Sequence, residues 1–244
     1  MENLYTLVTG SSSDIGKFIC MQIASNSPLI LHGRDFDKLN QLKECLPNSN
    51  THLIWQYDFI NADNLCYDTV SFIESNNIHI KNVVHIAGIA EFFPAHLLNR
   101  QSIKASFDVN FYSILDILSV LAKKKYKSFL NSIVLISSVS VHSVSGKGMA
   151  AYTSSKAAME IYAKSIAAEI APARINAIAL GGIKVNKNDG ISQSLDSDIT
   201  SYPLGVGMPD NAADMVSFLL SDNSSWITGQ IFIVDGGFSI NGNR

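Results

Sequence analysis

The sequence predicts an α/β fold, in which one doubly wound parallel sheet of about seven strands has helices on both faces. Short apolar runs alternate with longer helical patterns from end to end, and this alternation is typical of a parallel sheet with right-handed crossovers. The apolar runs lack polar alternation, which indicates strands that are covered on both faces. At 244 residues, without a linker or a repeat, the chain is expected to form a single domain over residues 1–244.

The elements are expected in strict alternation along the chain. The strands are the apolar runs 4–9, 29–32, 52–57, 82–86, 132–137, 175–180 and 231–234, and the helical patterns include 15–25, 36–46, 64–76, 108–121 and 157–170. The last two helical patterns contain few charges and are apolar nearly all round. A helix that covers a sheet needs only one apolar face, so we expect their other sides to be buried in a homo-oligomer, either a dimer or a tetramer.

The balance of charge argues against nucleic acid as a partner. The net charge is −3, whereas a protein that binds nucleic acid is usually far more basic. One cluster of like charge comprises Lys123, Lys124, Lys125 and Lys127. It follows a long helical pattern, where cations complement the carbonyl-rich end of a helix, and a docking surface for an acidic partner is the alternative.

Cysteine usage and the first residues bear on the compartment. Cys20, Cys45 and Cys66 are widely spaced and each lies in a helical pattern, so we expect buried free thiols and a reducing compartment. No CxxC pair or histidine-rich cluster predicts a metal site. The first strand pattern begins at Leu4, which leaves no room for a signal peptide, and no apolar stretch reaches membrane-spanning length. We therefore expect a cytoplasmic protein that does not enter a membrane.

Polar residues and glycines directly follow the expected strands. In a doubly wound sheet, ligands bind at the carboxyl ends of the strands, near the point where the strand order reverses. The residues in that position are Gly10, Arg34, Asp58, Gly88, Ser138 and Gly181. Their shared placement predicts one common site.

A turn rich in glycine and serine connects the first strand to the first helix. Such a turn places backbone amides and a helix N-terminus against a pyrophosphate, and the contacts expected here come from Gly10, Ser11, Ser12, Ser13, Ile15 and Gly16. The spacing is not the GxGxxG of longer dinucleotide-binding domains, and a plain β–α turn uses the same residue types. The position directly after the first strand, with Tyr152 and Lys156 downstream, favours cofactor binding.

Tyr152 and Lys156 lie four residues apart in an alanine-rich helical pattern, so they share one face of the helix. A free tyrosine titrates near 10, and an ammonium about 4 Å away, at an effective dielectric of about 20, contributes roughly 4 kcal/mol. We expect this charge to lower the pKa of Tyr152 by up to roughly three units. Tyr152 would exchange a proton with a substrate oxygen, which Ser138 would hydrogen-bond. Taken alone, a tyrosine and a lysine at this spacing usually lie on the solvated surface of a helix.

With these residues in place, the chain resembles a single-domain short-chain dehydrogenase/reductase over essentially its whole length. The family's cofactor turn TGxxxGxG corresponds to residues 9–16, its NNAG to residues 85–88, and its TGQ…VDGG ending to residues 227–237. The resemblance implies a Rossmann-type sheet and hydride transfer between a nicotinamide cofactor and a carbonyl or alcohol. Its catalytic set corresponds to Asn110, Ser138, Tyr152 and Lys156, and its further cofactor contacts to Arg34, Asp58, Phe59, Ala87, Gly88, Tyr152, Lys156 and Ile183. In this family the Asn holds a proton-relay water.

The sequence departs from the family pattern at several positions near the cofactor. Asp14 replaces the middle glycine of the turn, and because Asp is a favoured N-cap, we expect it to cap the next helix and point away from the pyrophosphate. His85 and Ile86 replace two asparagines, and we interpret His85 as a hydrogen-bonded strand-end residue rather than a catalyst. Val185 replaces a threonine that bonds the nicotinamide carboxamide, which leaves the backbone at Ile183 for that contact.

Two segments are candidates for the walls of a substrate pocket. Residues 186–202 are polar and follow the sixth strand, where the family closes over substrate; a flexible surface loop is the alternative. His142, Val144 and Met149 lie between Ser138 and Tyr152, and would either line the pocket or simply pack the loop.

The end of the second strand predicts NADP(H) as the cofactor. A carboxylate after that strand binds the ribose 2′-hydroxyl in NAD enzymes, whereas here Gly33 occupies that place and Arg34 follows, able to bond a 2′-phosphate. Asp35 and Ser13 are counterweights, and the alternative is that Arg34 is a solvated turn residue.

The sequence therefore predicts an NADP(H)-dependent oxidoreductase that acts on a small-molecule carbonyl or secondary alcohol and resembles 3-oxoacyl-thioester reductases. The alternatives are a sugar or small-ketone dehydrogenase that uses NAD, and a non-enzymatic NADP(H)-binding sensor or scaffold.

Overall fold

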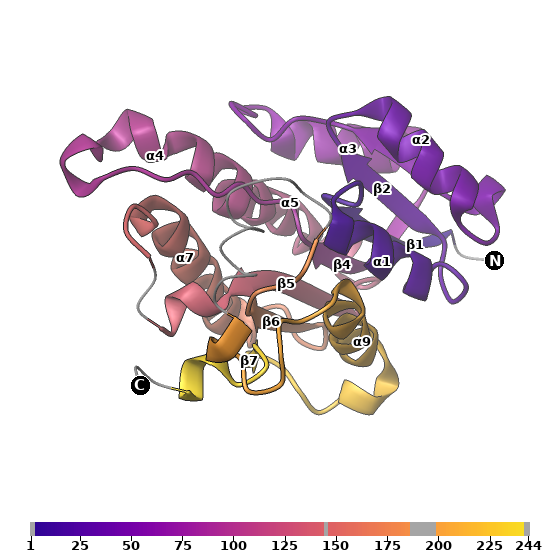
Figure 1. Cartoon of the computed structure of the whole chain (residues 1–244). Coiled ribbons are helices and arrows are strands. Elements are labelled where there is room, and N and C mark those ends of the chain that lie inside the picture. Colours follow the sequence, from indigo (N-terminus) through magenta and orange to yellow (C-terminus); the bar gives the residue numbers. More distant parts are fainter. Residues whose placement is uncertain (1–2, 144–145, 186–198, 242–244) are drawn as a thin grey trace.

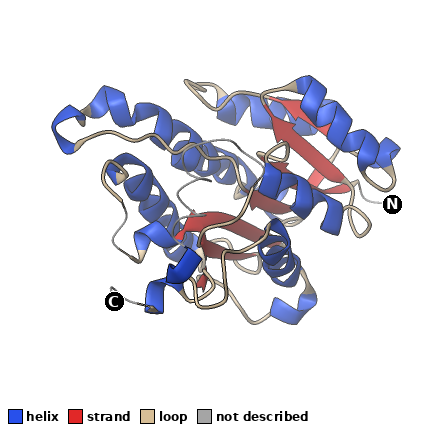
Figure 2. Cartoon of the chain, in the orientation of Figure 1, coloured by secondary structure: helices blue, strands red, loops and turns tan. Residues whose placement is uncertain are grey.

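The computed structural model describes residues 3–143, 146–185 and 199–241, and within them it confirms the predicted parallel sheet (Figures 1 and 2). The strands are β1 Leu4–Thr9, β2 Leu29–Gly33, β3 Leu53–Gln56, β4 His79–His85, β5 Ser132–Ser138, β6 Arg174–Leu180 and β7 Ile231–Val234. They pair in the order β3-β2-β1-β4-β5-β6-β7, and every pair is parallel. The order reverses between β1 and β4, so the carboxyl ends of these two strands form the switch point at which ligands bind.

Helices cover both faces of the sheet, as the unbroken apolar strand runs predict. They are α1 Asp14–Ile23, α2 Phe36–Cys45, α3 Leu65–Ser75, α4 Arg100–Phe107, α5 Ser113–Leu121, α6 Lys124–Lys127, α7 Ala150–Ile166 and α9 Pro209–Leu220. Buried side chains of α3, α5 and α7 form one core cluster with the sheet, and those of α1, α2 and α9 form the other. The two layers hold the carboxyl ends of the strands rigidly in one row.

The observed elements differ from the predicted ones mainly at their ends. β4 begins at His79, three residues before the predicted start. α7 begins at Ala150 and ends at Ile166, so the pattern predicted over 157–170 and the one that contains Tyr152 and Lys156 belong to a single helix. The helix predicted over 108–121 is longer and interrupted: α4 leads into a π-helical turn, Asp108–Tyr112, and then into α5. A π-helical turn changes the direction in which side chains leave the helix, and such turns are frequent at functional sites.

The three cysteines are free thiols, as predicted, but only Cys20 has the predicted burial. Cys20 is fully buried and burial raises the pKa of its thiol, whereas Cys45 is exposed and Cys66 is half-buried; all three are free. Cys45 is the last residue of α2, where the helix end leaves the core. No helix among the described residues is both long and apolar enough to cross a membrane.

The lysine cluster follows the end of α5, as the helical pattern predicts. Lys123 is the N-cap of α6, which contains the other three lysines, and the Lys127 ammonium donates to the Glu169 carbonyl at 2.6 Å, just beyond the end of α7. Lys125 pairs with Glu74 at 2.5 Å. Lys127 therefore complements a carbonyl just beyond the end of α7, whereas the effect of the cluster on the end of α5 stays a prediction.

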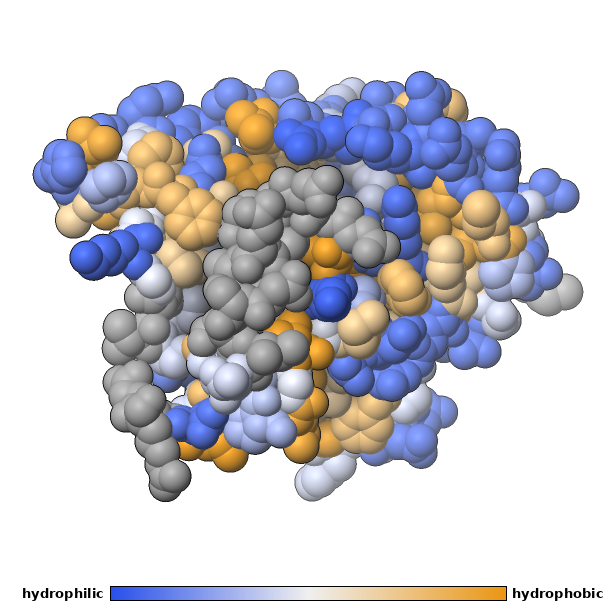
Figure 3. Space-filling view, viewed as in Figure 1, coloured by the Kyte–Doolittle hydropathy of each residue, from blue (hydrophilic) through white to orange (hydrophobic). Residues whose placement is uncertain are grey.

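The surface over α2 is mostly polar, whereas apolar side chains gather over the end of the molecule that holds α4 (Figure 3). Phe92 and Leu97, in the connection from β4 to α4, are 49% and 53% exposed. The same connection contacts the loop between β5 and α7, because the Phe93 amide donates to the Gly148 carbonyl at 2.9 Å. An apolar surface therefore lies beside the loop that joins Ser138 to Tyr152.

Candidate active site

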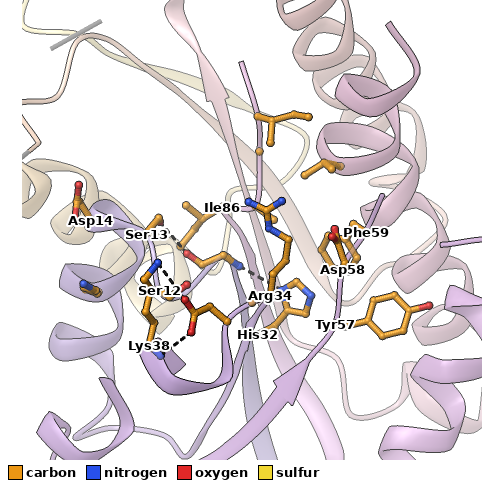
Figure 4. A pocket seen from close by; sticks show the side chains of 18 residues that line it. Ser12, Ser13, Asp14, His32, Arg34, Lys38, Tyr57, Asp58, Phe59 and Ile86 are labelled. Atoms are coloured by element: carbon orange, nitrogen blue, oxygen red, sulfur yellow. Dashed lines mark hydrogen bonds and ion pairs between the residues drawn. The ribbon is translucent and has the colours of Figure 1, made fainter. Parts of the chain in front are cut away.

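A cavity of about 420 Å³ lies at the carboxyl ends of β1 to β4, at the switch point of the sheet (Figure 4). Eight of the residues predicted to bind a cofactor line it: Gly10, Ser12, Ser13, Arg34, Asp58, Phe59, Ala87 and Gly88. The sequence reasoning missed Asp14 as a cavity residue, together with Lys17, His32, Gly33, Asp35, Lys38, Tyr57, Ile86, Ile89 and Val109. Most of the missed residues lie within a few residues of a strand end, or one helical turn beyond it. That position in the sequence could have identified them as cavity residues.

Six predicted cofactor residues do not line this cavity: Ser11, Ile15, Gly16 and Ile183, together with Tyr152 and Lys156 of α7. The Ser11 side chain is fully buried and its hydroxyl donates to the His32 carbonyl at 3.0 Å, so it secures the turn to β2 instead. Ile15 and Gly16 lie in the first turn of α1. Ile183 is 8% exposed, and its neighbour Lys184 bonds the Gly207 carbonyl at 2.7 Å, beyond the end of β6.

The turn after β1 depends on a glycine and a serine cap. Gly10 has a φ of +68°, and a Cβ there would lie 2.8 Å from the Ala87 amide, so only glycine allows β1 and β4 to approach this closely. Ser13 is the N-cap of α1: its hydroxyl accepts from the Gly16 amide at 3.1 Å and donates to the Gly10 carbonyl at 2.8 Å. The N-terminus of a ten-residue helix therefore faces the cavity, as anion binding requires.

The expectation that Asp14 caps the next helix is wrong, whereas its direction relative to a pyrophosphate stays a prediction. Asp14 is the first residue of α1 rather than its cap, because Ser13 already has the extended backbone and the bonding partner of an N-cap. Asp14 is among the residues that line the cavity, and it lies on the far side of Ser13 from Arg34 (Figure 4). One carboxylate oxygen is buried and has no hydrogen-bond partner within the described residues.

Arg34 and two lysines give the cavity a cationic wall. Arg34 leaves the end of β2, exposed, and extends along the cavity (Figure 4). Asp35 caps α2 by accepting from the Lys38 amide at 3.1 Å, and it also pairs with the Lys38 ammonium at 3.1 Å. The Lys38 amide, and then its side chain, hold the pKa of Asp35 below its usual value. The Asp35 carboxylate is therefore engaged by α2 and Lys38, while Lys17 adds a further cation.

Two neutral histidines lie under the cavity, in register with Thr9 on β1. The Thr9 hydroxyl accepts from the amides of Ile86 and Ala87, and it shares a hydrogen bond of 2.9 Å with His85 Nδ1. Burial lowers the pKa of His85 far below its usual value and that of His32 to about 3. His85 is thus a structural residue, as expected, although within the described residues its Nε2 has no hydrogen-bond partner.

Ser138, Tyr152 and Lys156 meet where β5 ends against α7. Ser138 is the last residue of β5, and its hydroxyl hydrogen-bonds the Tyr152 hydroxyl. Lys156 is 3% exposed, and its ammonium donates to the Ile136 carbonyl at 2.7 Å and lies 6.0 Å from the centre of the Tyr152 ring. The structure therefore brings together the three residues that the sequence placed in one catalytic set.

The predicted lowering of the Tyr152 pKa is wrong for the protein without cofactor. Burial raises the pKa of Tyr152, and the hydrogen bond from Ser138 only partly opposes this. Burial also lowers the pKa of Lys156 to about 8, against the opposing charge of Glu160. The sequence argument assumed an ammonium near the phenol oxygen, whereas the Lys156 ammonium is bound to a strand carbonyl and loss of water dominates.

Asn110 joins the catalytic set to the end of the cavity. It is fully buried in the π-helical turn, and its amide nitrogen donates to the Ile89 carbonyl at 3.0 Å and to Ser155 Oγ at 2.8 Å. Its carbonyl oxygen accepts from the Ile89 amide at 2.8 Å. A Cβ on Gly88 would lie 3.3 Å from both Asn110 Oδ1 and Lys156 Nζ, so the last residue of the cavity borders the catalytic lysine.

The remaining predictions for the substrate side have mixed outcomes. His142 contacts Glu160 rather than a cavity, with its Nε2 at 3.0 Å from the carboxylate. Met149 precedes the first residue of α7. Val144 and residues 186–198 of the proposed closing segment lie outside the described residues.

Taken together, these residues fit a dinucleotide. One end of the cavity has a cationic wall, its middle faces a capped helix N-terminus, and its other end borders Lys156 and Asn110. In the part of the chain that the structure describes, no group of three histidine, cysteine or acidic side chains could hold a metal ion. The arrangement can therefore hold a phosphate-containing cofactor against a tyrosine that is able to donate a proton.

Comparisons with known proteins agree with this arrangement. Residues 12–239 match the family model described as enoyl-(acyl carrier protein) reductase. The chain is 33% identical over 237 residues to a 3-oxoacyl-(acyl-carrier-protein) reductase of Rickettsia bellii and 31% identical over 237 residues to that of Rickettsia prowazekii, with 95% of each chain covered. Among solved structures, a short-chain type dehydrogenase/reductase from Mycobacterium ulcerans superimposes with a TM-score of 0.85 at 27% identity, covering 98% of this chain and 91% of the other.

Proposed function

Because the chain belongs to the short-chain dehydrogenase/reductase family, we propose that it is an NADP(H)-dependent reductase that converts a 3-oxoacyl thioester, or a similar ketone, to the secondary alcohol. The observation on which this proposal rests is that Ser138, Tyr152 and Lys156 meet beside the end of a cavity of about 420 Å³ that has a cationic wall and faces a helix N-terminus. A reducing, cytoplasmic location and a homo-oligomer of two or four chains are parts of the same proposal.

The protein's own residues provide proton transfer and orientation. When bound, the nicotinamide supplies the hydride for the carbonyl carbon. The Tyr152 hydroxyl gives its proton to the substrate oxygen, and its raised pKa keeps that proton available at neutral pH, as reduction requires. Ser138 Oγ hydrogen-bonds the same oxygen, and Lys156 holds the ribose and places a positive charge beside Tyr152. Asn110 stabilises the backbone at Ile89, next to this group.

The preference for NADPH follows from the charges at the end of β2. Each oxygen of the Asp35 carboxylate already has a partner, the Lys38 amide for Oδ1 and the Lys38 ammonium for Oδ2, which lessens its attraction for a ribose 2′-hydroxyl. Arg34 is exposed on the cavity and can bond a 2′-phosphate. One such charge-assisted bond is worth about 1.5–3 kcal/mol, or roughly ten- to a hundred-fold in affinity.

An acyl substrate is favoured over a sugar by the surface beside the catalytic loop. Phe92 and Leu97 expose apolar side chains next to the connection that holds Ser138 and Tyr152. The named relatives reduce 3-oxoacyl groups on a carrier protein. An NAD-dependent sugar or small-ketone dehydrogenase is the second candidate. A non-enzymatic sensor is the third, but binding alone does not require the proton-donating Tyr152.

The test is a substrate panel that follows NADPH and NADH absorbance with the purified full-length chain. The panel contains an acetoacetyl thioester, small ketones, and sugars with their alcohols. We expect turnover of the thioester, with kcat/KM for NADPH roughly ten- to a hundred-fold above that for NADH. Arg34→Ala should lose this preference, whereas Arg100→Ala, a matched change on α4, should keep it. Equal kcat/KM for the two cofactors, or an unchanged preference in Arg34→Ala, would refute the cofactor assignment.

A further inference from the structure

Glu160 is a buried carboxylate that the proposed reaction does not use. It lies one helical turn after Lys156 on α7, and its side chain is 2% exposed. Ser137 Oγ donates to Glu160 Oε1 at 2.5 Å, and His142 Nε2 lies 3.2 Å from Oε1 and 3.0 Å from Oε2. A buried charge is costly unless it is paired and hydrogen-bonded, so this position requires a reason beyond packing.

The contacts of Glu160 continue a series between β5 and α7. The last three residues of β5 each bond one residue of the helix: Ile136 bonds Lys156, Ser137 bonds Glu160, and Ser138 bonds Tyr152. The three helix residues are four apart, so they follow one face. His142 adds a fourth contact, from the loop that leads from Ser138 to Tyr152. Glu160 therefore fastens the strand before Ser138 and the loop after it to one point of the helix.

Glu160 also supplies a negative charge close to the buried ammonium of Lys156. The titratable groups that interact with Lys156 in the described chain are Glu160 and Tyr152 on α7 and His85 on β4; those around Glu160 are Lys156 and His142. His85 is neutral, and the Ile136 carbonyl offers only a partial charge. The pKa of Lys156 is already lowered to about 8, so losing a nearby anion would make the amine neutral close to physiological pH.

Resting on the proposed function, we propose that Glu160 is a positioning residue for the reaction. Its carboxylate is the counter-charge of the Lys156 ammonium, and it fixes Ser137 and His142 on either side of Ser138. Glu160 reaches neither substrate nor cofactor and acts only through these three neighbours.

The charge is tested with Glu160→Gln, which keeps a hydrogen-bond acceptor and removes the anion. Glu169 is an exposed carboxylate just beyond α7, so Glu169→Gln is the matched control. NADPH affinity is measured by fluorescence between pH 6 and 10, together with kcat over the same range. Since neutral Lys156 holds the ribose poorly, the alkaline loss of affinity should begin about one pH unit or more lower in Glu160→Gln and stay unchanged in Glu169→Gln. A folded Glu160→Gln variant with the wild-type pH profile would overturn the proposal.

A rescue experiment separates charge from structure. Arginine stays protonated throughout this range. Lys156→Arg should therefore show no loss of NADPH affinity at high pH (no alkaline limb in the binding curve), with or without Glu160→Gln. A limb that reappears in the double variant would show that Glu160 acts on something other than the charge at position 156.

The positioning of the loop is tested with His142→Gln. His142 is 27% exposed, so this change threatens folding less than a change at Glu160. We expect kcat to fall about tenfold, with the KM for NADPH nearly unchanged, because Ser138 and Tyr152 lose their fixed separation. An unchanged kcat would overturn the claim that Glu160 positions the loop through His142. If Glu160→Gln does not fold, the His142→Gln result alone decides the proposal.

Failure of the proposed function can be distinguished from failure of the Glu160 proposal. A wild-type chain that neither binds NADPH nor turns over any substrate would refute the function. The dependence of unfolding on pH, which needs no cofactor, would still report whether Glu160 sets the charge state of Lys156.

Discussion

Raising the pH from 8 to 10.5 should stabilise this protein through Lys156, relative to a variant that lacks the amine. Burial lowers the pKa of Lys156 from 10.5 to about 8. Below pH 8 the ammonium is present in both the folded and unfolded states, and the folded state bears the cost of burying it. Between the two pKa values the folded state releases a proton that the unfolded state keeps, so the free energy of unfolding rises with pH.

The size of this effect follows from the shift itself. A change of about 2.5 pKa units corresponds to about 3 kcal/mol, because each unit is worth about 1.4 kcal/mol. The increase is spread over the window from about pH 8 to 10.5 and is complete above it. Replacement by methionine removes the titration and retains most of the side-chain volume, so Lys156→Met should lack the increase.

The assay is urea unfolding at pH 7.5, 8.5, 9.5 and 10 for the wild type, Lys156→Met and Lys164→Met. Lys164 is exposed on the same helix and controls for general charge effects. The difference in unfolding free energy between the wild type and Lys156→Met should grow by about 2–3 kcal/mol in favour of the wild type across this range. Parallel curves for these two proteins would refute the argument that Lys156 is held in a desolvated site.

Three further outcomes are expected. Tyr152→Phe should remove nearly all turnover and leave NADPH affinity within a few-fold, since only the hydroxyl is lost; retained turnover would exclude Tyr152 as the proton donor. Ser13→Ala should lower the free energy of unfolding by about 1 kcal/mol in urea, because the cap of α1 loses its bond from the Gly16 amide. Light scattering at micromolar concentration should give a dimer or tetramer, because Tyr112 and Ile161 are 47% and 61% exposed, and a monomer would contradict this.

The order of the elements could be predicted because each strand is an unbroken apolar run and each connection has helical periodicity. Burial on both faces removes the polar alternation, and β2 and β6 are indeed buried along their whole length. The ends were less predictable. β4 begins at His79, whose polar ring gives no sign of a strand but stacks on Phe129 at 3.6 Å. The π-helical turn at Asp108–Tyr112 has no local pattern that distinguishes it from ordinary helix.

The site residues Gly10, Arg34 and Ser138 were predictable, because each is a residue type that has few roles at the end of a strand. The site was not predictable where two side chains compete for one role. Ser13 and Asp14 are both good N-caps, and the choice depends on which backbone becomes extended. Ser11 is the same residue type as Ser12 and Ser13, but its hydroxyl is fully buried and bonds the His32 carbonyl on β2. Such differences are set by the approach of separate segments, which no local pattern describes.

The pKa of Tyr152 illustrates the same limit for chemistry. Spacing shows that Lys156 shares a helix face with Tyr152, but not that both side chains are withdrawn from water, which raises the pKa of the phenol and lowers that of the amine. Both pKa shifts favour the neutral form of the side chain. Burial alone would therefore remove the positive charge on Lys156 that proton transfer needs. A negative charge that is itself buried and hydrogen-bonded can prevent this without attracting water. Glu160, eight residues after Tyr152 on the same helix, meets that requirement, and its contacts with Ser137 and His142 keep it in place.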